Sequence, residues 1–470
     1  MGEDLRESAT RRRPHDTVIM ETSMRTRTLI LGLAALLAGC SVLAGDETSP
    51  VQQSAPTPTE AAPTLEAPTT PSPLADSPDM TGEGPSEIVL TVWTSEGLSP
   101  SSEAPGGQVL VEQLAAFDET HPDIRVEIYV KRSQGPGSTL AYLRTAPPVA
   151  PDVLPDVALL DQKALAQATA EELIVPIGSL LDPAIANELY PAARELGTIG
   201  EQMVGLPYAL EVQHLAYRVT FFQEPPNSFE AILESPVPYV FPAAPEDSVN
   251  HTLLLQYMAA VDGNLTDEEG RPVLDADALR EVLGFYADAR AAEVVDPALF
   301  QITDPAETWA LYRDRQANLA ATTSTLYLAE RDQVRNTAVT WTPTPTGDPY
   351  ALVGGWSWAI VTQDPERQAA AMLLLNFLMN PVNQGTYTQA SYWLPTQPAA
   401  LAVWGDGDPY TGFGDLLLRN ARPLPDPSLQ SVIGGALQEA LEAVLLNDVP
   451  PVQAATEAAQ SVNPPQEEAP

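Results

Sequence analysis

The chain is poor in cysteine, lysine and histidine, and these shortages limit the disulfides, partners and catalytic groups that it can have. Its 470 residues include one cysteine, Cys40, so no disulfide can form within the chain. Its two lysines, Lys131 and Lys163, are among only 23 basic residues, which face 63 acidic ones and leave a formal net charge of −40. A surface this acidic repels phosphate backbones, so we exclude nucleic acid as a partner.

The sequence offers little for catalysis or for a bound cofactor. Residues 355–359 (GWSWA) come close to the G-x-S-x-G turn of serine hydrolases, but more strand-like residues follow Ser357 where that motif needs a helix. Beyond residue 39, a histidine base could come only from His121, His214 or His251. There is no H-E-x-x-H pair, P-loop or G-x-G-x-x-G fingerprint. We therefore expect no enzyme, no metal site and no cofactor, with a glycosidase-like carboxylate pair as the alternative that so many acids leave open.

The N-terminus has the pattern of an export signal. From Met24 the chain reads MRTRTLILGLAALLAGC, in which two arginines precede an apolar run that is too short to span a membrane as a helix. The ending resembles a bacterial lipobox, in which the cysteine is acylated. We expect residues 1–39 to be a signal peptide with its true start at Met24, and Cys40 to carry a lipid on the extracytoplasmic face of the cell membrane. The alternative is an ordinary signal peptide followed by a free thiol.

The next segment, residues 40–86, is rich in proline, serine and threonine and has no basic residue. It cannot bury a core, and we interpret it as a disordered tether.

From residue 88 onward, strand and helix patterns alternate. Residues 88–93 form an apolar, β-branched run, and Leu110, Leu114 and Phe117 then recur at helical spacing. Residues 124–130 alternate between apolar and polar side chains, as a half-buried strand does. Strand, helix and strand at this spacing predict a βαβ unit with parallel strands. Because the pattern returns late in the chain, we predict an α/β protein, and the length of 470 residues suggests two lobes.

Residues 353–361 (VGGWSWAIV) place two glycines and two tryptophans in one predicted strand. Gly354 and Gly355 would let the main chain approach a ligand closely, and Trp356 would offer a flat ring to the apolar face of a sugar. For Trp358 we favour a position in the core. Since the two tryptophans lie on the same face of an extended strand, the assignment of each stays open.

Several segments, in colinear order over residues 87–462, resemble one family, the maltose-binding-protein-like solute-binding lipoproteins of ABC importers (extracellular solute-binding protein family 1). They include EIVLTVWTSEG, LPDVALLDQ, VGLPYALEVQHLAYR, GGWSWAIVTQDPERQ and SYWLPTQPAAL. The resemblance implies a two-lobed periplasmic-binding-protein fold of type II, with a ligand cleft between the lobes and a hinge of several strands. Lobe 1 would comprise residues 87–211 and about 349–394, lobe 2 residues 212–346 and about 398–462, and residues 463–470 would be a tail. The chain would cross between lobes near residues 211–212, 346–349 and 395–398.

The resemblance also implies a set of ligand-binding residues at the ends of strands and at the crossings. Thr325 adds a hydroxyl beside them, and Asn250 and His251 are weaker candidates at the rim of the second lobe. The set is Trp93, Ser95, Glu96, Asp161, Gln162, Tyr208, Glu211, Thr323, Ser324, Gly354, Gly355, Trp356, Tyr392 and Trp393.

The function implied is that of a lipid-anchored, extracytoplasmic binding protein that captures a mono- or oligosaccharide and delivers it to the permease of an ABC importer. We expect it to be a monomer. The alternative is the same fold binding a non-sugar solute such as a polyamine, or acting as a ligand sensor. A cleft with many acids and few aromatics would favour the cationic solute.

Overall fold

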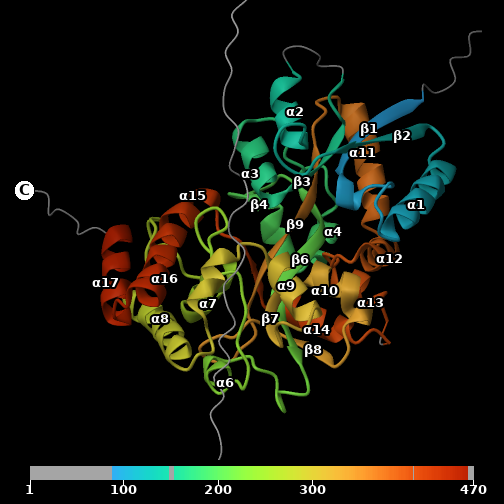
Figure 1. The fold of residues 1–470 in the computed structure, drawn as a ribbon. Coiled ribbons are helices and arrows are strands. Elements are labelled where there is room, and N and C mark those ends of the chain that lie inside the picture. The colour runs from blue at the N-terminus through green and yellow to red at the C-terminus, as the bar shows by residue number, and fades with distance from the viewer. Residues whose placement is uncertain (1–86, 148–152, 406, 464–470) are drawn as a thin grey trace, which may run out of the picture. The chain divides into compact units, whose positions relative to one another are not determined.

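The computed structural model describes residues 87–147, 153–405 and 407–463. The predicted signal peptide, the lipidated Cys40 and the tether lie outside the described residues. Within these ranges, two sheets meet along one long strand, β6 (Leu206–Arg218). Each sheet carries its own apolar cores, and these cores define two lobes (Figure 1).

The lobe 1 sheet has the strand order β2-β1-β3-β9-β6. β1 pairs in parallel with β2 and β3, as the βαβ prediction requires, whereas β9 runs antiparallel to β3 and to β6. Side chains of β3 alternate between two cores, since Val157 and Leu159 pack into one and Ala158 and Leu160 into the other. A sheet covered on both faces explains why β3 is apolar at four successive positions. The bounds are β1 (Ile88–Ser95), β2 (Ile124–Lys131), β3 (Val157–Asp161) and β9 (Ala351–Ile360), with a small hairpin of β4 (Thr198–Ile199) and β5 (Gln202–Met203).

Helices cover both faces of the lobe 1 sheet, and their caps follow from the sequence. Asp364 accepts hydrogen bonds from the backbone N–H groups of Glu366 and Arg367, and Pro365 occupies the first turn. An N-capping residue followed by proline predicts the start of a helix, and α11 begins at this position. Asn380 caps the following helix in the same way. The helices are α1 (Gly106–Thr120), α2 (Thr139–Thr145), α3 (Gln162–Ala170), α4 (Pro183–Glu188), α5 (Pro191–Leu196), α11 (Pro365–Leu378), α12 (Pro381–Ser391), α13 (Pro398–Ala402) and α14 (Tyr410–Arg419), with the short 3-10 turn η1 (Glu96–Leu98).

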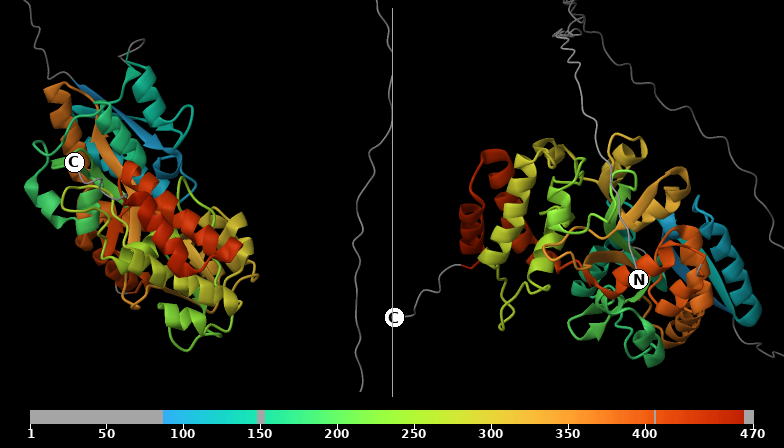
Figure 2. Two further views of the ribbon diagram at one scale, coloured as in Figure 1. Left: turned by 90° about the vertical axis from the view of Figure 1, so that its left-hand side faces the viewer. Right: turned by 90° about the horizontal axis from the view of Figure 1, so that it is seen from below.

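Lobe 2 is built on the C-terminal half of β6, which pairs antiparallel with β7 (Leu319–Thr323) and β8 (Thr337–Thr340). Most of its mass is helical, and the last two helices of the chain pack beside α8 (Figures 1 and 2). The helices are α6 (Phe229–Leu233), α7 (His251–Ala260), α8 (Ala276–Ala291), α9 (Pro305–Arg313), α10 (Ser324–Glu330), α15 (Pro427–Leu429), α16 (Gly435–Asn447) and α17 (Pro451–Val462), with 3-10 turns η3 (Pro297–Gln301) and η4 (Arg331–Gln333) and the π-helical turn η5 (Gln430–Gly434).

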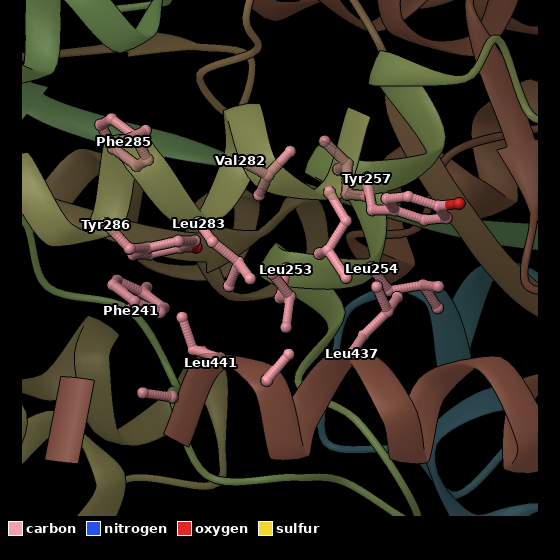
Figure 3. Packing of buried hydrophobic residues seen from close by; sticks show 14 of the residues in the cluster. Phe241, Leu253, Leu254, Tyr257, Val282, Leu283, Phe285, Tyr286, Leu437 and Leu441 are labelled. Carbon is pink, nitrogen blue, oxygen red and sulfur yellow. The ribbon is translucent and has the colours of Figure 1, made fainter. Parts of the chain in front are cut away.

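The largest core of lobe 2 lies between α7, α8 and α16, where Leu253, Leu437 and Leu441 meet Phe241 and Tyr286 (Figure 3). These side chains are almost entirely buried, and each such leucine stabilises the fold by roughly 1.5–3 kcal/mol. The helical segment Pro427–Asn447 is long and apolar enough to cross a membrane, but half of it is buried in this core. It is accordingly a core helix of lobe 2.

Within the described part of the chain, three segments connect the lobes. The first runs along β6, which pairs with β9 up to Val212 and with β7 from Gln213. The second runs from β8 to β9. The third corrects the expectation for residues 395–398, because it follows β10 (Ala421–Pro423), which still pairs with β9.

The lobe 2 boundary predicted at residue 398 shifts with this third crossing. Leu401, Tyr410 and Leu417 pack into the lobe 1 core, so α13 and α14 belong to lobe 1.

Candidate functional site

Two adjoining cavities lie between the lobes, with volumes of about 580 Å³ and about 1490 Å³. Glu211, Glu246, His251 and Gly354 line both cavities, which makes them parts of one cleft. The smaller cavity is bounded by all three crossing segments, through Glu211 on β6, Gly354 on β9 and Leu424 after β10. A solute held there would touch both lobes and every connection between them.

Glu211 is the central charged group of the cleft. It is the last residue but one of β6 before the strand enters the lobe 2 sheet, and the Thr325 hydroxyl donates a hydrogen bond to its carboxylate. Burial raises the pKa of Glu211, the nearby hydroxyl groups of Thr325 and Thr323 oppose that rise, and the nearby carboxylates of Glu246 and Asp304 add to it. The ionised form of Glu211 is therefore destabilised in the empty cleft, and a hydrogen-bond donor or a cation of the solute would stabilise it.

The lobe 2 rim of the cleft carries His251 at the start of α7. The amide of Gln213 lies 3.3 Å from its Nδ1, and a carboxylate oxygen of Glu246 lies 3.6 Å from the same atom. Burial lowers the pKa of His251, against the opposing effect of Glu246 and Asp247, which favours the uncharged ring. Asn250, by contrast, is buried; it caps α7 and hydrogen bonds with Gln438.

The lobe 1 rim is formed by the start of α3. Asp161 caps this helix by accepting from the N–H of Ala164, and burial raises the pKa of its carboxyl group. Gln162 donates its side-chain amide to the carbonyl of Leu424 at 2.9 Å, which ties α3 to the third crossing segment. Lys163 reaches across the cleft mouth to Asp247, with its Nζ 3.0 and 3.1 Å from the two carboxylate oxygens.

Two half-buried tryptophans, Trp356 and Trp393, line the larger cavity and rest against the lobe 1 core. Trp358, two residues along the same strand, is 3% exposed and packs against Tyr208 with ring centroids 5.6 Å apart. The structure thus separates the tryptophan pair, placing Trp356 at the cleft and Trp358 in the core.

The two glycines also separate. A Cβ on Gly354 would meet nothing within 4 Å, whereas a Cβ on Gly355 would lie 2.3 Å from the carbonyl oxygen of Ala209 on β6. Both glycines border the larger cavity, but only Gly355 is required by packing between strands.

Six of the predicted ligand residues do not line either cavity. Three belong to the first-strand loop: Trp93 is buried under Tyr142 and Lys131, Ser95 is buried, and Glu96 is exposed at the start of η1. Lys131 lies 4.3 Å from the centre of the Trp93 ring, and this packing keeps the ring on lobe 1.

The other three belong to the fold itself. Tyr208 stacks on Tyr387 in the lobe 1 core. Ser324 is fully buried and accepts from the N–H of Val212. Tyr392 ends α12 with a left-handed backbone (φ 65°) and packs against lobe 1.

The remaining predicted residues are brought together at the cleft: Asp161, Gln162, Glu211, Thr323, Gly354, Gly355, Trp356 and Trp393. The prediction missed Glu246 and Asp304, which face Glu211, and also Arg422 on β10 and Leu424 at the start of the third crossing. Asp304-Pro305 is recognisable in the sequence as a helix start, but nothing local says that this helix begins at the cleft.

A two-lobed α/β fold with a cleft at the connecting strands defines a class, the extracytoplasmic solute-binding proteins. Residues 112–410 match the model of a protein family described as "bacterial extracellular solute-binding protein". The chain belongs to this family, which confirms the resemblance seen in the sequence; it is a family of binding proteins and not of enzymes. No curated protein matches the sequence.

Solved structures share the fold over nearly their whole length. Maltose-bound MalE3 of T. maritima has 19% identity and a TM-score of 0.61, over 80% of this chain and 99% of that one. The cyclic alpha-maltosyl-1,6-maltose binding protein of Arthrobacter globiformis has 17% identity and a TM-score of 0.65, over 81% and 98%. The sugar-binding protein MalE of Xanthomonas citri has 18% identity and a TM-score of 0.63, over 80% and 96%. They confirm the two-lobed fold.

Proposed function

We propose that the chain is the lipid-anchored solute receptor of an ABC importer and that its solute is a mono- or oligosaccharide held in the cleft. The observation that carries this proposal is the pairing of flat rings and acceptors in one cavity. Trp356 and Trp393 present indole surfaces to the same space that Glu211 and Asp161 line with carboxylates. A sugar has apolar C–H faces for the rings and hydroxyl donors for the carboxylates.

The cavity's size and position support capture by closure. About 1490 Å³ exceeds the volume of a typical small-ligand pocket, roughly 300–1,000 Å³, and would accommodate several sugar rings. Because the cleft residues come from both lobes, a solute that contacts both would favour the closed arrangement. The sugars named for the solved relatives are in keeping with this assignment.

Delivery to an importer and attachment through Cys40 rest on the family and on the Leu-Ala-Gly-Cys sequence. Mass spectrometry of the protein extracted from membranes tests the anchor: a diacylglyceryl group on Cys40 supports it, and a polypeptide that lacks lipid contradicts it.

The smaller cavity favours a second candidate, a cationic solute such as a polyamine. Glu211, Glu246 and Asp304 line this cavity, and no lysine, arginine, phenylalanine, tyrosine or tryptophan is among the described residues around it. A protonated amine would neutralise carboxylates that now repel one another.

A thermal-shift screen of the purified protein separates the two candidates. Maltose, maltotriose, cellobiose, xylobiose and common monosaccharides form one arm, and putrescine and spermidine form the other. A ligand at a hundred times its Kd stabilises the folded state by about 2.7 kcal/mol, which is readily measured. A response to a saccharide that is lost in Trp356→Ala and partly kept in Trp356→Phe supports the sugar receptor. A response to polyamines alone, unaffected by Trp356→Ala, supports the second candidate.

A further inference from the structure

Three consecutive hydroxyl residues, Thr323, Ser324 and Thr325, connect lobe 2 to β6 at the first crossing. Thr323 pairs with Gln213 in the β6–β7 ladder. Ser324 accepts a hydrogen bond from the N–H of Val212 at 3.1 Å. Thr325 donates to the carboxylate of Glu211. Each residue of the triplet thus holds one residue of the crossing strand.

The hydrogen bonds through this triplet have a single consistent direction. An ionised carboxylate can only accept, so the hydroxyl hydrogen of Thr325 must point to Glu211. The Thr323 and Thr325 hydroxyl oxygens are 3.0 Å apart, and with the Thr325 hydrogen already used, Thr323 must donate to Thr325. Thr323 in turn accepts from the N–H of Leu326 at 3.4 Å, as the N-cap of α10. The relay runs from a backbone N–H to Glu211 without a mismatch.

Apart from this relay, burial and the neighbouring carboxylates disfavour the ionised form of Glu211. Glu246, on the loop before α7, and Asp304, before α9, add negative charge nearby, and burial acts in the same direction. His251 of α7 lines the same cavity in its uncharged form, and Tyr410 of α14 also interacts with the Glu211 charge. The hydrogen bond from Thr325, which itself accepts from Thr323, favours the ionised form of Glu211.

We infer that Thr325 is a positioning residue, which orients the Glu211 carboxylate as a hydrogen-bond acceptor toward the cleft. Since a carboxylate accepts about four hydrogen bonds, capacity remains for donors of a solute. The relay belongs to lobe 2 whereas β6 passes into the lobe 1 sheet, so the acceptor keeps its orientation only while the triplet stays docked on the crossing. This inference adds a specificity device to the proposed receptor and rests on that proposal for its use.

The test measures Glu211 itself and needs no solute. The side-chain carboxyl resonance of Glu211 is followed by carbon-13 NMR from pH 3 to 9 in the ligand-free protein, and is identified by its absence in Glu211→Gln. Thr325→Val removes the donor and is expected to raise the pKa of Glu211 above its value in the unaltered protein. Thr325→Ser keeps a hydroxyl and should restore the original titration.

Thr322→Val is the matched control. Thr322 lies on β7 next to Thr323 and is 1% exposed. Its hydroxyl has no hydrogen-bond partner among the described residues, so this change should leave the Glu211 titration in place. If Thr325→Val does not fold, Thr325→Ala removes the same donor with a smaller side chain. An unchanged Glu211 pKa in the Thr325 variants, or an equal shift in Thr322→Val, overturns the inference. Neither result bears on whether the cleft binds a sugar, which the solute screen decides.

Discussion

Adding one methyl group to each of the two cleft glycines should have opposite effects on stability. At Gly355 the new Cβ would lie 2.3 Å from the Ala209 carbonyl oxygen and 3.0 Å from a methyl carbon of Leu210. The oxygen belongs to the paired strand β6 and cannot turn aside as a flexible side chain would. Either β9 or β6 must shift, and overpacking of this kind costs about 1–3 kcal/mol.

Gly354→Ala is the matched control, because its Cβ would enter open space. An alanine in a strand loses less backbone entropy on folding than a glycine does, so this variant should be more stable by about 0.5–1 kcal/mol. Unfolding entropy is about 2.1 cal/mol/K per residue, so a lobe of roughly 200 residues changes its midpoint by about 5 °C for 2 kcal/mol.

Differential scanning calorimetry of the three ligand-free proteins provides the comparison. We expect Gly355→Ala to melt about 2–7 °C below the unaltered protein, and Gly354→Ala to melt at or slightly above it. The same Gly354 methyl group would project into both cavities and should weaken solute binding. The reasoning is refuted if Gly355→Ala melts within 1 °C of the unaltered protein, or if Gly354→Ala is the less stable of the two.

Two ion pairs between the lobes should differ in strength. Arg331 and Asp408 form a bidentate pair with N···O distances of 2.6 and 2.7 Å, and Asp408 is only 7% exposed. Arg331→Met should therefore lower the free energy of unfolding by about 2–4 kcal/mol in a denaturant titration. A decrease of less than about 1 kcal/mol would contradict this. Burial acts to raise the pKa of Asp408, but hydrogen bonds from Arg331 and from the Tyr410 N–H outweigh it and lower that pKa. The pair's contribution is thus complete above the ordinary carboxyl pKa and is lost as the pH falls through the lowered one, so Arg331→Met should reduce the loss of Tm between about pH 5 and pH 3. Lys163 and Asp247 are 56% and 63% exposed, so Lys163→Met should lower the free energy of unfolding by less than about 1 kcal/mol. The same change should weaken solute binding at most a few-fold, and about 1 M salt should remove this difference. A larger loss of affinity that does not depend on salt would show a different role for Lys163.

The parts of the fold that were predictable are those with local causes. The apolar runs and helical spacing of residues 88–130 predict the β1-α1-β2 unit, and Asp364-Pro365 predicts the start of α11, because capping and periodicity act within a few residues. The third crossing was misplaced since nothing local distinguishes Pro398 from any other helix start. The position of α13 and α14 depends on which core buries Leu401 and Leu417, and that is decided by contacts distant in sequence.

The site shows the same division. The end of β3 can be read from the sequence and identified Asp161, whereas Glu211 and Trp356 lie inside β6 and β9 and were identified through the family resemblance. Which way a side chain turns at a strand end cannot be read there. Trp93 lies under Lys131, and Tyr208 stacks on Tyr387, because partners from other elements complete a core around them.

Isothermal titration of the purified protein with the saccharide that gives the largest thermal shift tests the central claim most directly, with Trp356→Ala and Trp356→Phe measured beside it. The account predicts one binding site per chain, a loss of affinity of at least about tenfold in Trp356→Ala, equivalent to about 1.4 kcal/mol, and a smaller loss in Trp356→Phe. The ligand-free Tm of both variants should stay near that of the unaltered protein, since Trp356 is only half-buried. Saccharide binding of unchanged affinity in Trp356→Ala, or no saccharide binding at all, would contradict the assignment of this cleft to a sugar.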